Sequence, residues 1–434
     1  MKPRSTLMGL VIGVALLVCV PFLLSQGLVN AAIQMLIAAL FASSYNVLCG
    51  QAGMLSFGHA AYFGVGAFAT VHAMNALAGT GLLPTPLLPL AGAFGGLFIG
   101  AIAGWFATKR TGTIFAMITL AIAELLHSLA PHLKGLFGGE AGVSSMRMPS
   151  MGLSFGSTNE MYYLTLAWVV VCAALLYLYT LTPVGRLALG LRENGHRLRF
   201  LGYDVHKLSV LVFSISAMFC GVAGGLQVLN NEAANYALFD GSLSASVVLN
   251  TYIGGVKVFL GPALGASLMT FFGYAVSDLT QSWLLYQGIL FVLVMLFMPG
   301  GMAGMFGVLS SLRRRFGTAQ LVPVLVASVA AALLLTAGSA FLIEMLQRLF
   351  SRDYRSLVAA SLSAPWPPIA LYRVLWAPAS AVTWLVPAAL FGVGGALACL
   401  ARRRLVRLEQ QHEAKRLNEG SNEHAAVDVA GGAA

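Results

Sequence analysis

Few side chains within the long apolar runs of this sequence could do chemistry. The ionisable candidates are Glu124, Lys257, Asp278 and His59. An acid inside a membrane segment is by default a candidate for proton relay or substrate contact. For Glu124, one helical turn from His127, a structural hydrogen bond is an equal alternative. His59 has no second His, Cys or carboxylate spaced to complete a metal site, so a hydrogen-bonded structural histidine is favoured.

Catalytic and cofactor motifs are missing from the sequence. We find no GxxxxGK[ST] phosphate loop, no nucleophile–base arrangement and no metal-ligand cluster. The five cysteines show no CxxC spacing and fall in or beside apolar segments, which favours buried apolar residues over disulfides or zinc ligands. The sequence therefore predicts no enzyme and no cofactor bound by this chain, and any nucleotide would be bound by another subunit.

Composition predicts an integral membrane protein. The 434 residues are 58% hydrophobic and only 9% charged, with a mean hydropathy of +0.83. Apolar runs of about 20 residues are typical of membrane-spanning helices. We expect an all-α polytopic protein with about 11–12 membrane segments. One of these segments, at 243–256, is a candidate for a broken or re-entrant helix. The net charge of +10 does not indicate nucleic-acid binding, because the basic residues cluster at the ends of apolar runs.

The basic clusters also predict an orientation. Clusters at 109–110, 183–207, 313–315 and 402–404 fall on one side of the membrane if the chain starts in the cytoplasm. Both termini are then cytoplasmic, with the first apolar run as an uncleaved span. The segment 344–376 is expected outside, although it contains four arginines. The expected location is the bacterial cytoplasmic (inner) membrane.

One polar stretch, 182–207, separates two apolar blocks and is too short for a domain. Pro183 suits the first turn of a helix, Gly195 interrupts it, and Gly202 suits a helix C-terminus. Two interpretations are open: a positively charged loop that only fixes orientation, or an amphipathic element that docks into a groove on a partner protein.

Small residues mark two further stretches. Glycines flank a polar break at Gln51–Ser56, which indicates either tight helix packing or a bend beside a translocation path. Gly92, Gly96, Gly100 and Gly104 are spaced four apart, so one face of that helix is expected to pack closely on another helix, within the subunit or across a dimer.

Several segments resemble the permease subunits of branched-chain amino acid ABC importers (the LivM/LivH type). These are GRLALGLRENGHRLRFLGYDVHKLSVLVFSISAMFCGVAGGL, YNVLCGQAGMLSFGHAAYFGVGAFAT, KRTGTIFAMITLAIAE and YIGGVKVFLGP. The resemblance covers roughly 26–307. It implies a permease core at 26–307. The apolar runs and charges outside it predict a first span at 1–25, a C-terminal extension with two more spans at 308–400 and a charged cytoplasmic tail at 401–434.

The resemblance also implies roles for particular residues. In the family, the segment from 185 carries coupling helices that sit in a cleft of a cytoplasmic ATPase. The expected ATPase-coupling residues are Arg186, Arg192, Glu193, Asn194, Leu201 and Gly202. The expected translocation-path residues are Gln51, Gly53, Ser56, His59, Glu124, Gly254 and Gly255. Lys257 stands where the family usually has glycine.

The function implied is ATP-driven import of branched-chain or other apolar amino acids, or of a related small solute such as urea or an amide. The implied partners are a second, homologous permease, two ATPases that use ATP and magnesium, a periplasmic substrate-binding protein and membrane lipid. The alternative is a secondary transporter or channel driven by an ion gradient, for which Glu124, Lys257 and Asp278 are the only candidate charges. Uptake without an ATPase would favour that alternative.

Overall fold

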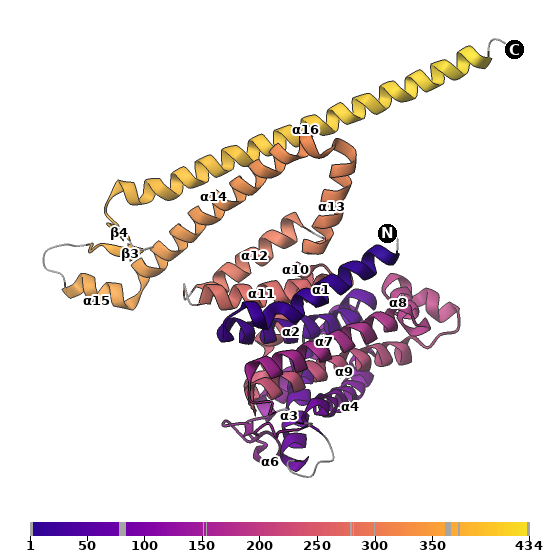
Figure 1. Cartoon of the computed structure of the whole chain (residues 1–434), viewed down its shortest axis with the longest axis vertical. Helices are drawn as coiled ribbons and strands as arrows, with labels where there is room; N and C mark the ends of the chain where they lie inside the picture. Colours follow the sequence, from indigo (N-terminus) through magenta and orange to yellow (C-terminus); the bar gives the residue numbers. More distant parts are fainter. Residues whose placement is uncertain are drawn as a thin grey trace. The chain divides into compact units, whose positions relative to one another are not determined.

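The computed structural model describes residues 3–77, 84–150, 152, 154–277, 280, 282–298, 300–360, 366–371 and 374–431. Within these ranges the chain is helical almost throughout, and the few strands are two or three residues long (Figure 1). The prediction of an all-helical membrane protein is confirmed. The chain divides into two compact units, 1–279 with 283–305, and 280–282 with 306–434. The predicted four-part division stays a prediction.

The first unit contains most of the helices. In chain order they are α1 (Pro3–Leu23), α2 (Gln26–Asn46), the π-helical turn η1 (Val47–Gln51), α3 (His59–Leu77), η2 (Thr85–Leu87), α4 (Pro89–Ala107), α5 (Gly112–Leu129), α6 (Lys134–Phe137), α7 (Thr158–Leu181), α8 (Pro183–Phe200), α9 (Val205–Asn231), η3 (Tyr236–Phe239), α10 (Gly241–Gly254), α11 (Gly261–Ser277) and α12 (Trp283–Phe297). Two short strands, β1 (Val143–Ser144) and β2 (Ala233–Ala234), pair antiparallel. Helix α13 (Gly301–Phe316) begins in this unit and continues into the second.

Seven described helices are long and apolar enough to cross a membrane, and the bent pair Trp283–Leu296 and Gly301–Phe316 would make an eighth. The other expected segments form helices that are shorter or more polar: α10 has 14 residues, α11 has 17, and α3 contains polar residues such as His59 and Asn75. The count by length and hydropathy is therefore lower than the expected 11–12. The 41° bend lies between α12 and α13, whereas α10 is a short helix that ends at Gly254.

Close backbone contacts hold the centre of the first unit together. The α4 glycines face α9 within the same chain: a Cβ built on Gly96 would lie 2.3 Å from the Ala217 carbonyl oxygen, and one on Gly92 would lie 2.5 Å from that of Gly221. At the same point of α9, a Cβ on Gly66 of α3 would lie 2.3 Å from the Gly221 Cα. Small residues thus let three helices approach to backbone contact, as the spacing of the α4 glycines predicts.

The second unit is built on two long helices, α14 (Thr318–Phe350) and α16 (Ala381–Gly431), which lie side by side (Figure 1). Between them come α15 (Arg352–Ala360) and a hairpin of β3 (Ile369–Leu371) and β4 (Val374–Trp376). The Trp376 ring packs edge-on against Phe341 with centroids 4.9 Å apart. Both helices are long and apolar enough to cross a membrane at the positions of the two predicted extra spans, and α16 continues through the charged tail to Gly431.

Candidate coupling segment and membrane path

Helix α8 is polar and lies between the spans α7 and α9. The Thr182 hydroxyl caps its start by accepting a hydrogen bond from the Gly185 N–H, 3.2 Å away, and Pro183 occupies the first turn. At its end Gly202 adopts a φ of +86°, and the Tyr203 N–H donates to the Leu198 carbonyl, 3.0 Å away. A glycine in the left-handed region with such a bond is a common helix stop. The predicted roles of Pro183 and Gly202 in the backbone are therefore confirmed.

Two helical segments make up α8, and the break lies at Asn194 rather than at the predicted Gly195. Asn194 has a φ of −163° and a ψ of 98°, which is extended backbone. Its side-chain oxygen accepts a hydrogen bond from the Arg197 N–H at 3.1 Å. Asparagine in extended backbone is a favoured N-cap, so Asn194 ends one segment and caps the next.

The second segment of α8 presents apolar side chains to the outside. Phe200 is 92% exposed and Leu201 is 66% exposed, whereas Leu198 is buried. Arg186, Arg192 and Glu193 are also exposed. Large apolar side chains among charges on a polar element are typical of a surface that contacts a partner. The sequence analysis missed Phe200, although an aromatic residue between Arg199 and Leu201 was the available signal.

Arg192 connects α8 to the polar break in the membrane region. Its guanidinium donates a hydrogen bond to the Gly50 carbonyl of η1 at 2.5 Å. Gly53, with a φ of +70°, lies against the Arg192 side chain: a Cβ on Gly53 would be 2.9 Å from the Arg192 Cγ. Two predicted sets, the coupling residues and the path residues, therefore meet at this contact.

The polar break itself is a π-helical turn followed by an extended stretch before α3. It contacts the end of α10, where the Cys49 thiol lies 3.5 Å from the Tyr252 hydroxyl. Four side-chain atoms in these two regions are buried without a hydrogen-bond partner among the described residues: Asn46 Oδ1, Gln51 Oε1, Asn250 Oδ1 and Thr251 Oγ1. Such atoms are costly in hydrocarbon and are tolerated where they face a wet cavity.

Ser56 and His59 lie deeper in the first unit and are fully buried. The His59 ring nitrogens are 3.1 Å from the Ser56 hydroxyl and 2.9 Å from the Ser216 hydroxyl. The Ser216 hydroxyl in turn donates to the Ser44 carbonyl at 2.7 Å. This chain of bonds ties α2, α3 and α9 together. In the part of the chain that the structure describes, no group of three potential ligands could hold a metal ion.

Glu124 lies near the end of α5, with a half-exposed carboxylate 3.9 Å from the His127 ring. Its other near neighbour is Gly241, where a Cβ would be 2.9 Å from the carboxylate oxygen. Glu124 is thus beside the start of α10, away from the polar break. Lys257 is exposed in the turn after α10, and Asp278 lies outside the described residues.

Gly254 and Gly255 form a tight crossing between α10, α11 and the start of α13. A Cβ on Gly254 would lie 2.0 Å from the Gly261 carbonyl, and Gly255 has a φ of +106°. On the other side, a Cβ on Gly301 would be 2.4 Å from the Gly255 Cα. Glycine is required at these positions because the backbones approach each other closely. A role of Gly254 and Gly255 in the translocation path stays a prediction.

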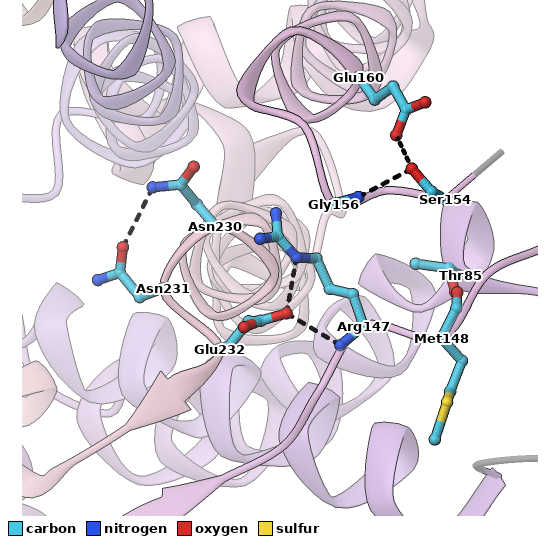
Figure 2. A network of polar contacts seen from close by, with 9 residues as sticks. All are labelled: Thr85, Arg147, Met148, Ser154, Gly156, Glu160, Asn230, Asn231 and Glu232. Atoms are coloured by element: carbon cyan, nitrogen blue, oxygen red, sulfur yellow. Dashed lines mark hydrogen bonds and ion pairs between the residues drawn. The ribbon is translucent and has the colours of Figure 1, made fainter. Parts of the chain in front are cut away.

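At the other end of α9, a polar contact fixes the connection after β1. Glu232, with a φ of +56°, accepts hydrogen bonds from both the backbone N–H of Arg147, at 3.0 Å, and its guanidinium, at 2.9 Å (Figure 2). Burial alone would raise the pKa of the Glu232 carboxyl, but these bonds and the Arg147 charge outweigh it and hold the pKa below its ordinary value. No local pattern in the sequence predicts this pair, because 85 residues separate its members.

Comparisons with known proteins bear on this arrangement. Residues 27–299 match the family described as "Branched-chain amino acid transport system / permease component". The chain is 27% identical to the high-affinity branched-chain amino acid transport system permease protein LivM of Salmonella typhimurium, over 70% of this chain and 76% of that protein. It is also 27% identical to LivM of Escherichia coli, over 66% of this chain and 72% of that protein.

A probable LivM of Methanocaldococcus jannaschii is 26% identical over 56% of this chain and 77% of that protein. No solved structure matches this chain significantly. The family match covers well over half of the chain and includes α8, η1, Gly254 and Gly255. The protein is therefore a multi-pass transport subunit, not an enzyme, and it belongs to the branched-chain amino acid transport permease family.

Proposed function

We propose that this chain is the membrane-spanning subunit of an ATP-driven importer for branched-chain or other apolar amino acids, or a related small solute. ATP and magnesium are used by two separate ATPases. A second, homologous permease completes the path, and a periplasmic protein delivers the solute. The complex is located in the bacterial cytoplasmic membrane, with both termini and α8 in the cytoplasm. The matched family description and the LivM relatives support the substrate class.

The observation that carries the proposal is the contact between Arg192 of α8 and Gly50 of η1. In this mechanism, the exposed Phe200 and Leu201 side chains and the charges around Glu193 dock into a cleft of the ATPase. When the ATPases close, α8 moves. Because Arg192 is bonded to η1 and packs on Gly53, the movement of α8 reaches the polar break directly.

The polar break then acts as a gate. Its buried oxygens, such as Gln51 Oε1 and Asn46 Oδ1, acquire partners when the cavity fills with water or substrate. Few charges lie along this region, which suits an apolar zwitterion held by backbone groups, helix ends and packing. Asn194 provides the joint between the two α8 segments, and Gly202 the turn into the span α9.

The test is Arg192→Glu in the assembled complex, reconstituted in vesicles with its ATPases. We expect ATP hydrolysis to continue while uptake falls about 10-fold or more, within the usual range of a coupling free energy. The amount of folded permease should fall only slightly, because the substitution removes one hydrogen bond of a residue at the surface.

The matched control is Arg315→Glu, which makes the same charge change at an exposed position of α13 and should leave uptake unchanged. Normal uptake by Arg192→Glu would contradict the coupling role. Cross-links from the Glu193 position provide a second measurement, and failure to reach any ATPase would contradict docking. Uptake by the permease alone would instead support an ion-gradient transporter.

A further inference from the structure

A basic pocket lies beside the second segment of α8. Its volume is about 1290 Å³. It is enclosed by the turn 108–111 after α4, the start of α5, the stretch 52–57 after η1, and parts of α8 and α9. All of these belong to the first unit. Gly53 of the polar break lies on its wall, but none of the coupling or path roles assigned above uses its basic residues.

The pocket carries positive charge without any neutralising acid. Lys109, Arg110 and Arg199 line it together with two histidines, and no Asp or Glu is among its described lining residues. None of the ion pairs between described residues involves these three cations. Three cations on the wall of one pocket, with no ion pair to neutralise them, favour the binding of an anion.

The start of a helix on the pocket wall favours a phosphate. Residues Thr111–Thr113 at the N-terminus of α5 line the pocket, and no side chain caps this helix. Free backbone N–H groups at a helix start favour phosphate and carboxylate oxygens.

The apolar side of the pocket indicates an amphiphile. Met117 is 70% exposed and Leu120 is 40% exposed on α5, and both line the pocket. Trp105 and Phe106, at the end of α4, are also exposed, and Lys109 Nζ lies 5.6 Å from the centre of the Phe106 ring. Aromatic and basic residues at the end of an apolar helix are typical of the headgroup level of a bilayer.

We propose that this pocket binds the phosphate headgroup of an anionic phospholipid such as phosphatidylglycerol, with an acyl chain along the exposed face of α5. Lys109, Arg110 and Arg199 neutralise the phosphate, and the backbone N–H groups at the start of α5 donate hydrogen bonds to it. Basic pockets between membrane helices commonly bind such headgroups. A soluble phosphate would contact only the basic side of the pocket and would leave its apolar wall uncovered.

The experiment uses the full-length chain, delipidated in a neutral detergent. Binding is measured by native mass spectrometry during titration with phosphatidylglycerol, phosphatidylcholine or inorganic phosphate. We expect phosphatidylglycerol to bind and the other two not to compete with it at equal concentration. The double variant Lys109→Gln/Arg110→Gln should weaken phosphatidylglycerol binding about 25-fold, or about five-fold per charge, and Arg199→Gln should weaken it about five-fold.

The matched control is Arg313→Gln/Arg314→Gln, which removes two exposed charges of α13 that lie outside the pocket and should leave binding unchanged. The melting temperature of each variant is measured beside its lipid binding, so that a folding defect is distinguished from a loss of lipid contacts. Equal weakening by the control would show that only net charge matters and would overturn the proposal. Binding of inorganic phosphate as tight as that of the lipid would also overturn it, in favour of a soluble anion.

Discussion

Helices α9 and α16 have the same mean hydropathy over their most apolar windows, 1.9, yet they are used in opposite ways. In α9, 78% of that window is buried inside the chain, and in α16 only 17% is. Helix α14, with a hydropathy of 2.3, is also mostly exposed. Hydropathy therefore shows that each helix enters a membrane, but it does not show which one lies at the centre of a bundle.

Small residues make the difference. Helix α9 meets its neighbours through backbone: a Cβ on Gly221 would be 2.1 Å from the Gly92 carbonyl, and one on Gly224 would be 2.0 Å from that of Phe63. Helices α14 and α16 meet through side chains instead, as where Gly394 faces Leu335. Backbone contact fixes a rigid centre, whereas the exposed apolar faces of α14 and α16 require lipid or another subunit to cover them.

The largest expected effect comes from filling the α9 contact. Gly221→Val places a branched side chain where even a single Cβ would overlap the α4 backbone, and neither helix can move without breaking its other glycine contacts. We expect a loss of at least about 3 kcal/mol and little folded protein in the membrane, measured by thermal unfolding of the detergent-purified chain.

The control for this prediction is Gly395→Val on α16, where no atom lies within 4 Å of an added Cβ. The same chemical change should be neutral or slightly stabilising there, because valine favours a helix more than glycine does. Equal losses of stability in the two variants would show that α9 and α16 do not differ in how closely their glycines are packed.

A smaller effect is expected from the contact between α14 and α16. An added Cβ on Gly338 would lie 3.2 Å from the Leu390 Cβ, and side chains can shift where backbone cannot. Gly338→Leu should therefore cost about 1–3 kcal/mol, and the loss should be confined to the second unit. Limited proteolysis can measure this, with faster cleavage near α15 and unchanged protection of α9. Gly392→Leu, on the open face of α16, serves as the control, and faster cleavage there too would contradict the prediction.

Much of the architecture could be predicted because it follows from local patterns. The four-residue spacing of the α4 glycines indicates a close helix contact, and Pro183 and Gly202 mark the ends of α8. The number of spans was harder to predict, because α10 and α11 are apolar but shorter than a bilayer crossing requires.

The candidate site depends more on long-range contacts. The break at Asn194 rather than Gly195 reflects the side-chain cap to Arg197, which glycine cannot provide. The bond between Arg192 and Gly50 joins residues 142 positions apart, so no local pattern reveals it. The sequence could name Arg192 and the neighbouring Gly53 as functional candidates, but only the fold brings them together.

The smallest expected effect tests the edge of the well-packed unit, where a polar contact replaces backbone packing. Because the pKa of Glu232 is lowered, its carboxylate stabilises the fold above the unfolded pKa of about 4.3, and this contribution is lost as the pH falls through the folded value. Glu232→Gln should cost at most about 1 kcal/mol at pH 7, since the carboxylate is partly exposed. The difference in melting temperature from the unmodified protein should shrink below about pH 4. Glu160→Gln, which alters a carboxylate that accepts a hydrogen bond from the Ser154 hydroxyl, provides the comparison. A difference for Glu232→Gln that grew on acidification would mean that Arg147 does not hold this carboxylate in its ionised form.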